Sequence, residues 1–129
     1  MIVDSSAVVA VLLREPGHEP LLEQLGAAAR SGIGAPTAVE SGIVLTARLG
    51  IPGKTLLARF IDEAGMAVIP VTGEHWPLAV GAFVRYGKGR HPAALNFGDC
   101  LTYAVAAVAG EPLLCVGDDF ARTDLRLVV

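Results

Sequence analysis

Acidic residues in this chain follow short apolar runs or lie near the start of helix-like segments, far apart in the sequence. They are Asp4, Glu40, Asp99 and the adjacent pair Asp118 and Asp119. Carboxylate oxygens are the ligands that Mg²⁺ and Mn²⁺ prefer. In an open parallel α/β sheet the carboxyl ends of the strands lie along one edge, where acids distant in sequence can meet. The spacing therefore predicts one acidic metal site.

Structural roles would also explain these acids one at a time. Asp4 is well placed to cap a following helix, and Glu40 lies three residues after Thr37, which is the spacing of a capping box. The other acids suit the first turn of an apolar helix or a turn after a strand. These explanations weaken for the whole set, since two carboxylates about 4 Å apart repel by about 4 kcal/mol at an effective dielectric near 20. A divalent cation would reverse that repulsion, and without it we expect one or more acids to bind a proton at a raised pKa.

The elements that must position these acids alternate between short apolar runs and helical periodicity. The expected strands are residues 2–3, 33–36, 66–71, 112–116 and 125–129, and the expected helices are residues 5–13, 19–30, 37–49, 52–64, 74–86 and 98–109. This alternation predicts an α/β fold built on a parallel sheet. The chain has 129 residues, of which 53% are hydrophobic and 18% charged, as expected for one domain over residues 1–129.

Composition also indicates in which compartment the protein is expected and which partners it would bind. The apolar stretches are too short for a membrane span, so we expect a soluble, cytoplasmic protein without a membrane partner. Cys100 and Cys115 lack metal-type spacing and are interpreted as reduced core residues. The net charge is −3, but setting the acidic cluster aside leaves a slightly positive remainder. Arg85, Lys88 and Arg90, on a Gly-rich segment, would contact phosphates there or form an ordinary solvated loop.

Several segments resemble a known family, the PIN-domain ribonucleases, and within it the VapC-type toxins of bacterial toxin–antitoxin pairs. The most specific segments are Met1-Ile2-Val3-Asp4-Ser5-Ser6-Ala7, Glu40 at the start of the third helix, Tyr86-Gly87-Lys88-Gly89-Arg90-His91, Leu95-Asn96-Phe97-Gly98-Asp99-Cys100, and Pro112 to Phe120 followed by Thr123-Asp124. None suffices alone, but their order and spacing together are specific. The resemblance covers essentially the whole chain.

The resemblance implies a three-layer α/β/α sandwich and a metal-dependent endoribonuclease that forms a homodimer and is held inactive by a cognate VapB-type antitoxin. By position, Asp4 and Asp99 look like the main ligands of Mg²⁺ or Mn²⁺. Glu40 and an acid at 118 or 119 would complete the set, and the family pattern Gly-x-Asp-Phe favours position 119.

Two further residues, Ser6 and Asn96, would orient the carboxylates or cap helices. In the mechanism that we predict, the metal activates a water that hydrolyses an RNA phosphodiester. Glu40 or the final Asp orients or deprotonates that water. The histidines His18 and His75 are interpreted as surface or helix-face residues.

Other function classes remain. A phosphoaspartyl enzyme would need a second Asp two positions after Asp4, where this chain has Ser6. A non-catalytic protein of the same fold would act by binding RNA or its antitoxin. Leucines that would form either a partner surface or core are Leu21, Leu22, Leu25, Leu45, Leu49 and Leu56. The acid cluster itself predicts that an antitoxin inhibits by inserting an Arg or Lys in place of the metal.

Overall fold

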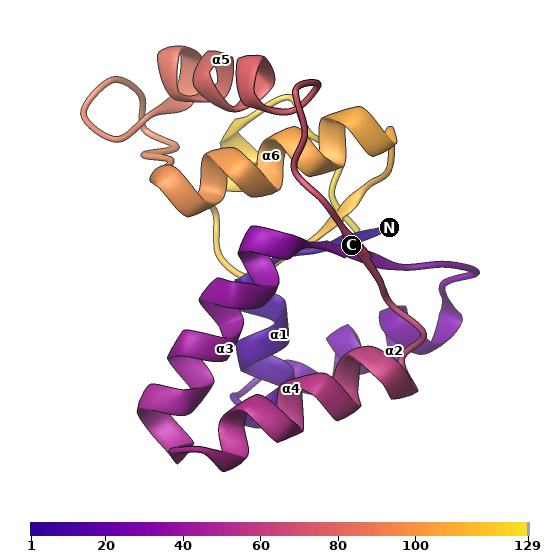
Figure 1. Ribbon diagram of the computed structural model, residues 1–129. Coiled ribbons are helices and arrows are strands. Elements are labelled where there is room, and N and C mark those ends of the chain that lie inside the picture. The colour runs from indigo at the N-terminus through magenta and orange to yellow at the C-terminus, as the bar shows by residue number, and fades with distance from the viewer. Residues whose placement is uncertain (129) are drawn as a thin grey trace.

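The computed structural model describes residues 1–128, which form a four-stranded parallel sheet with helices on both faces (Figure 1). The strands are β1 (Ile2–Val3), β2 (Gly32–Gly34), β3 (Ala67–Ile69) and β4 (Leu113–Leu114), in the spatial order β3-β2-β1-β4. The helices are α1 (Ser5–Leu12), α2 (His18–Ala27), α3 (Ala35–Leu49), α4 (Pro52–Glu63), α5 (Trp76–Tyr86) and α6 (Phe97–Ala109), followed by the 3₁₀ turn η1 (Phe120–Arg122).

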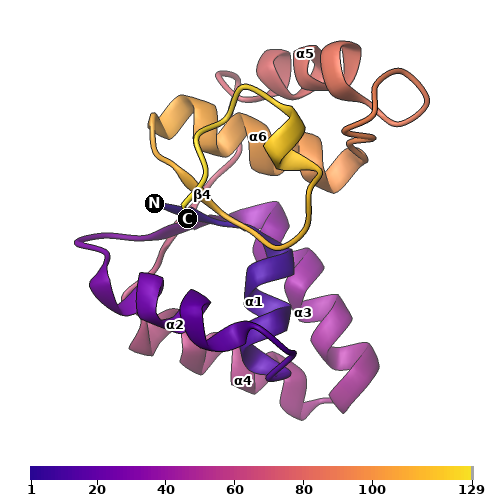
Figure 2. The same ribbon diagram turned by 180° about the vertical axis from the view of Figure 1, so that it is seen from behind.

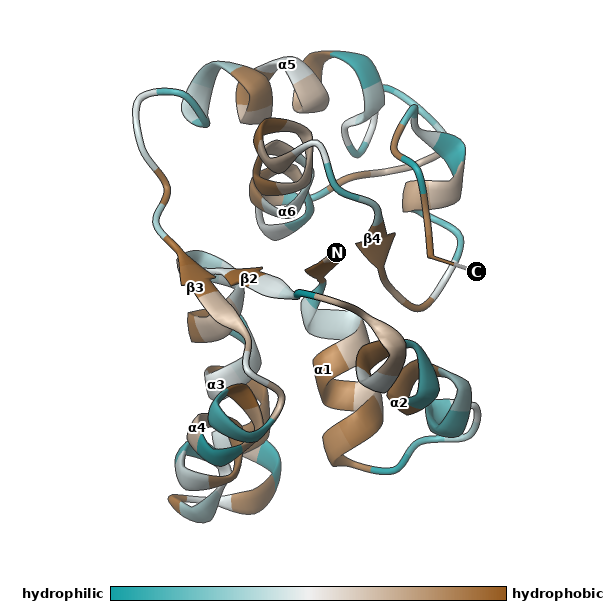
Figure 3. Cartoon of the chain, turned by 90° about the vertical axis from the view of Figure 1, so that its right-hand side faces the viewer, coloured by the Kyte–Doolittle hydropathy of each residue, from teal (hydrophilic) through white to brown (hydrophobic). Residues whose placement is uncertain are grey.

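The layers follow from the alternation of side chains along each strand. Successive residues of a strand point to opposite faces of the sheet. Ile2 and Leu113 therefore belong to the core under α5 and α6, whereas Val3 and Leu114 belong to the core on the other face. Figure 3 shows α5 and α6 above the sheet and α1 to α4 below it. The expected three-layer α/β/α sandwich is confirmed.

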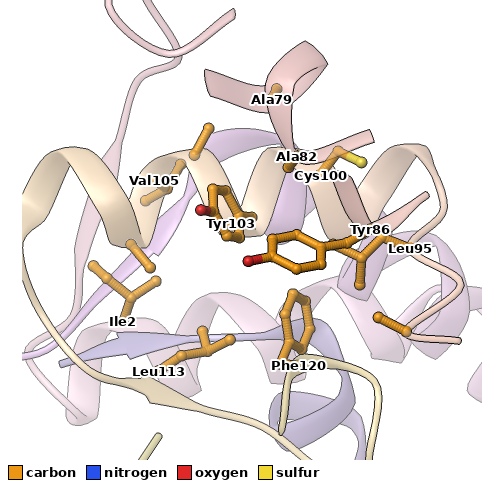
Figure 4. Close-up of a cluster of buried hydrophobic side chains, with 13 residues drawn as sticks. Ile2, Ala79, Ala82, Tyr86, Leu95, Cys100, Tyr103, Val105, Leu113 and Phe120 are labelled. Atoms are coloured by element: carbon orange, nitrogen blue, oxygen red, sulfur yellow. The ribbon is translucent and has the colours of Figure 1, made fainter. Parts of the chain in front are cut away.

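Aromatic residues anchor the C-terminal segment to this core. Figure 4 shows Tyr86, Tyr103 and Phe120 together in the cluster between the sheet and the α5–α6 layer. The ring centroids of Tyr86 and Tyr103 are 6.0 Å apart, and Phe120 is 3% exposed. In Figure 2 the segment after β4, in yellow, passes over α6 and returns beside β4. The buried Phe120 thus fixes the chain next to Asp119.

The capping box that was the alternative role for Glu40, with Thr37 as the helix cap, does not form. Helix α3 begins at Ala35, with Gly34 as its N-cap, so both residues lie inside the helix. The early start is possible because proline, here Pro36, suits the first helical positions, where its missing N–H is not needed. The Thr37 side chain is buried, and its hydroxyl oxygen lies 3.1 Å from that of Thr102.

Other expectations also needed correction. The strand expected at 125–129 is reduced to an isolated bridge between Leu113 and Leu127, and Val129 lies outside the described residues. His75 is not a surface residue: it is 4% exposed, and its Nδ1 atom accepts a hydrogen bond from the Thr72 N–H at 3.0 Å. For Leu45 the sequence left both a partner surface and the core open, and the structure shows the core, because its side chain is fully buried.

The leucines and cysteines singled out in the sequence differ in exposure. Leu22 and Leu49 are exposed. Cys100 and Cys115 are unpaired. Within residues 1–128 no helix is long and apolar enough to cross a membrane.

Candidate active site

The predicted acids come from separate chain segments and line one pocket at the carboxyl edge of the sheet. Asp4 directly follows β1, Glu40 lies in the second turn of α3, Asp99 in the first turn of α6, and Asp119 at the start of η1. The pocket has a volume of about 290 Å³. Asp118, one residue earlier and exposed, lies outside the lining. The geometry therefore favours position 119 for the fourth acid.

Asp4 is held rigidly at the base of this pocket. It is 4% exposed, and its Oδ2 atom accepts hydrogen bonds from the Ser6 N–H at 3.1 Å and from the Ser6 hydroxyl at 2.6 Å. The Thr102 hydroxyl donates to Oδ1 at 3.0 Å. Asp4 is therefore both the N-cap of α1 and a member of the acid pocket, so the two interpretations of its role are compatible.

Ser6 joins Asp4 to the neighbouring strand end. Its Oγ atom accepts a hydrogen bond from the Val116 N–H at 2.9 Å while its hydroxyl donates to Asp4. The expectation that Ser6 orients a carboxylate agrees with this geometry. Thr102 was not predicted from the sequence, although it lies three residues after Asp99 and hence on the same side of the helix.

Asp99 is fixed by a capping box at the start of α6. The Asn96 side chain accepts from the Asp99 N–H at 2.9 Å, and the Asn96 N–H donates to Asp99 Oδ2 at 3.0 Å. Asn96 thus caps the helix and orients the carboxylate in the same arrangement.

Burial and the neighbouring acids both raise the pKa of Asp99. Burial raises this pKa from 3.8 to about 6 and is the largest cause of the shift. The hydrogen bond from the Asn96 N–H opposes the increase. The carboxylates of Asp4, Asp119 and Glu40 add to it by repulsion. A raised pKa caused by burial and like charges is typical of a functional site rather than of a surface acid.

Glu40 and Asp119 are held differently from the other two acids. Within residues 1–128, their carboxylates accept no hydrogen bond and form no ion pair. Both side chains line the pocket nevertheless. The oxygens of these two carboxylates are therefore available to bind a cation or to accept hydrogen bonds from a ligand.

The chemistry of the lining fits a hard divalent cation. Cys115 lies nearby, but burial, helped by the negative charges of Asp4 and Asp119, raises the pKa of its thiol to about 11. The thiol therefore stays protonated and does not offer a soft sulfur ligand. Among residues 1–128, no three His, Cys, Asp or Glu side chains are close enough together to hold one ion as they stand. The donors that face the pocket are carboxylates, which Mg²⁺ and Mn²⁺ prefer.

The basic residues do not line the pocket but precede α6, which carries Asp99. Arg85 donates to the Tyr86 hydroxyl at 2.7 Å and lies 3.5 Å from Asp124, so its charge is already paired. The Arg90 Nε–H donates to the Val84 carbonyl at 3.3 Å. Lys88 is exposed. Lys88 and Arg90 are therefore better placed than Arg85 to contact a polyanion.

Comparison with known proteins agrees with this geometry. The sequence matches the PIN domain over residues 1–125. The chain belongs to the PIN-domain family. It is 52% identical over 127 residues to ribonuclease VapC36 of Mycobacterium tuberculosis, covering 98% of this chain and 91% of the relative. It is 42% identical over 131 residues to ribonuclease VapC of Mycolicibacterium smegmatis, covering 99% of each. Within the PIN domains, the chain therefore belongs with the VapC ribonucleases.

Solved structures show the same fold at lower identity. The crystal structure of Mycobacterium tuberculosis VapC20, described as a sarcin–ricin loop cleaving toxin, matches this PIN-domain protein with a TM-score of 0.80 and 19% identity, covering 98% and 97% of the two chains. VapBC2 from Rickettsia felis, bound to a DNA fragment from its promoter, matches with a TM-score of 0.79 and 14% identity, covering 98% and 96%.

Proposed function

We propose that this PIN-domain protein is a metal-dependent endoribonuclease toxin that cuts RNA phosphodiester bonds and is neutralised by a cognate VapB-type antitoxin. The observation that carries the proposal is the pocket shared by Asp4, Glu40, Asp99 and Asp119, which forms no ion pair with any cation of residues 1–128. The names of the VapC relatives support ribonuclease activity.

Asp4 and Asp99 are the residues that would hold Mg²⁺ or Mn²⁺. Both carboxylates are oriented by hydrogen bonds, Asp4 through Ser6 and Thr102 and Asp99 through Asn96. Such preorganisation lowers the cost of gathering negative charge around an ion. When bound, a divalent cation lowers the pKa of a coordinated water and offsets charge that develops on the phosphate.

Glu40 and Asp119 are the candidates for proton transfer. A general base must be able to accept a proton from the attacking water, and a carboxylate without hydrogen-bond donors retains that capacity. Both line the pocket, and neither accepts a hydrogen bond from residues 1–128. In our proposal one of them orients and deprotonates the water while the other helps to hold the ion.

Lys88 and Arg90 would hold the phosphates on one side of the cut. They lie in the segment between α5 and α6, and this segment leads directly to the Asn96–Asp99 capping box. Contacts to phosphates position an RNA without reading its sequence. Arg85 contributes less, because Asp124 and the Tyr86 hydroxyl already occupy its guanidinium.

The proposed partners are an antitoxin and a second copy of the chain. The solved neighbours include a toxin–antitoxin complex from Klebsiella pneumoniae and VapBC2 from Rickettsia felis. Large apolar side chains exposed on α3, α5 and α6 offer surfaces for such partners: Val39, Ile43, Val80, Phe83 and Phe97. Because the acid pocket has no cation of its own within residues 1–128, an Arg or Lys of the antitoxin would complement it.

The deciding experiment incubates the purified protein with total cellular RNA in Mg²⁺, in Mn²⁺ and in chelator, and maps the new ends by sequencing. The matched control is Asp99→Asn, which keeps an oxygen to accept the Asn96 N–H. We expect discrete cuts that require metal and disappear in the variant. Cuts that persist in the variant would overturn the role of Asp99. A protein that binds RNA but never cuts it would be a non-catalytic member of the fold.

A further inference from the structure

Glu40 reaches the pocket across the start of α6, where it lies against Gly98. A Cβ atom at position 98 would be 2.8 Å from Glu40 Oε2, 3.1 Å from Oε1 and 3.2 Å from Cδ. These carboxylate atoms are the nearest neighbours that the missing side chain would meet. The 2.8 Å contact is shorter than Cβ atoms make, so any larger residue at position 98 would have to displace the flexible end of the Glu40 side chain.

The backbone gives no reason for a glycine at this position. Gly98 lies in the first turn of α6 and has no positive φ, in contrast to Gly110, which ends the same helix in the left-handed conformation at φ 65°. Alanine is the better helix former by roughly 1 kcal/mol in a helix interior. Glycine at position 98 therefore forgoes helix stability in return for space next to Glu40.

We propose that Gly98 is a positioning residue for Glu40. Its missing side chain leaves the space in which the Glu40 carboxylate lies against the first turn of α6, beside Asp99. The N-terminus of this 13-residue helix favours negative charge there. A methyl group at 98 would move the flexible end of Glu40 toward solvent and leave the fold intact, because no backbone atom is among the nearest atoms that it meets. The inference rests on the proposed function, in which Glu40 acts in the reaction.

The test measures RNA cleavage (kcat and KM), Mn²⁺ affinity by calorimetry and the thermal midpoint for Gly98→Ala, Glu40→Gln and the double variant. For Gly98→Ala we expect an equal or higher midpoint, together with activity and Mn²⁺ affinity lowered by about 10- to 100-fold, the range typical of residues that orient metal ligands. In the Glu40→Gln background, adding Ala at position 98 should cause no further loss, because residues that act through one another are not additive.

A matched control is Gly81→Ala, in the middle of α5. A Cβ atom at position 81 has no neighbour within 4 Å among the described residues. This variant should gain stability for the same reason as Gly98→Ala and keep its full activity and Mn²⁺ affinity.

The outcomes separate this inference from the proposed function. If Gly98→Ala behaves like the unaltered protein while Glu40→Gln is inactive, the inference is overturned and the proposed function stands. If Glu40→Gln keeps full activity, Glu40 has no role in the reaction and both statements about it fail. A lower midpoint for Gly98→Ala would show damage to the fold and also overturn the inference. If no form of the protein cleaves RNA, the proposed function fails, and the inference is then tested by Mn²⁺ affinity alone. An affinity of Gly98→Ala equal to that of Gly81→Ala would overturn it.

Discussion

Acidic side chains at the two edges of the sheet differ in whether a positive charge of the chain pairs with them. At the amino edge, Glu111 accepts hydrogen bonds from Arg30 Nε and Nη2 at 3.0 and 2.7 Å. Pairing with Arg30 is the largest cause of the lowered pKa of Glu111. At the carboxyl edge, burial and neighbouring acids raise the pKa of Asp99 to about 6. One acid is compensated from within the chain, and the other is not.

This contrast helps to distinguish acids that serve the fold from acids that serve a ligand. Glu111 is paired with Arg30 and with the N-terminal ammonium group of Met1, so its charge is met from within the chain. The acid pocket gathers carboxylates that form no ion pair within residues 1–128, so a metal ion or a cationic partner would complement their charge. Uncompensated charge in a pocket is thus more informative than the number of acids in the sequence.

The largest effect is expected for Asp4→Asn. The change removes a charge from the pocket and turns an NH₂ group toward donors of Ser6 or Thr102, which leaves a buried polar group unsatisfied. Because Asp4 would hold the metal ion, we expect RNA cleavage to fall at least about 100-fold. The measurement is kcat/KM on a mapped substrate. The control is Asp118→Asn, outside the pocket lining, which should cleave normally; equal losses in both variants would contradict the geometry.

A smaller loss is expected for Ser6→Ala. The Ser6 hydroxyl donates a hydrogen bond to Asp4 and accepts one from the Val116 N–H. Its removal therefore breaks the link between Asp4 and the segment after β4. Groups that orient a metal ligand typically change affinity or activity by about 10- to 100-fold. Mn²⁺ titration and cleavage rates measure this effect. Ser5→Ala alters a neighbouring hydroxyl that makes no hydrogen bond within residues 1–128, and should have little effect.

The pH dependence of the metal-free protein sharpens the comparison. Because the pKa of Asp99 is raised from 3.8 to about 6, the folded protein retains between these pH values a proton that the unfolded chain releases. The contribution of Asp99 to the free energy of unfolding therefore falls as the pH rises from about 4 to about 6. In urea titrations, the free energy of unfolding of Asp99→Asn should fall less between about pH 4 and about pH 6 than that of the unaltered protein. The variant should therefore be the more stable form at pH 7. A less stable variant at pH 7 would mean that the carboxylate is compensated.

The smallest effect is expected for Glu111→Gln, and it should have the opposite sign. Since the pKa of Glu111 is lowered, its pairing with Arg30 stabilises the protein above the ordinary pKa of 4.5 and is lost as the pH falls through the lowered value. Thermal midpoints should therefore differ between variant and parent at pH 7 and converge at acidic pH. Cleavage activity should not change, and a loss of activity would show that the two edges are coupled.

Much of the site could be predicted from local sequence. Asp4, Asp99 and the Gly-x-Asp-Phe pattern around Asp119 lie at strand ends or helix starts, and the sheet brings those positions to one edge. The role of Asn96 follows equally from local spacing, because its partner Asp99 is three residues away. Such short-range features depend on the backbone of one segment and can be predicted from the sequence of that segment.

The errors came from features that depend on packing between distant segments. His75 was expected at the surface or on a helix face, yet it is buried and its Nδ1 atom accepts a hydrogen bond from the Thr72 N–H. The start of α3 was predicted at Thr37, because threonine is a common helix cap, but the helix begins at Ala35. The Thr37 hydroxyl contacts Thr102 of α6 instead. Local propensity is a weak guide where a tertiary contact offers a polar side chain another partner.

The sequence by itself determined the order of strands and helices, the PIN-domain family and the set of acids, because alternation, spacing and residue type are local properties. The tertiary structure placed Asp119 rather than Asp118 in the lining of the pocket, brought Thr102 to Asp4, and set the Glu40 carboxylate against Gly98. These features required three dimensions, because they join residues far apart in the chain, such as Asp4 and Thr102, which are 98 positions apart. They also depend on how helices on either side of the sheet approach its carboxyl edge.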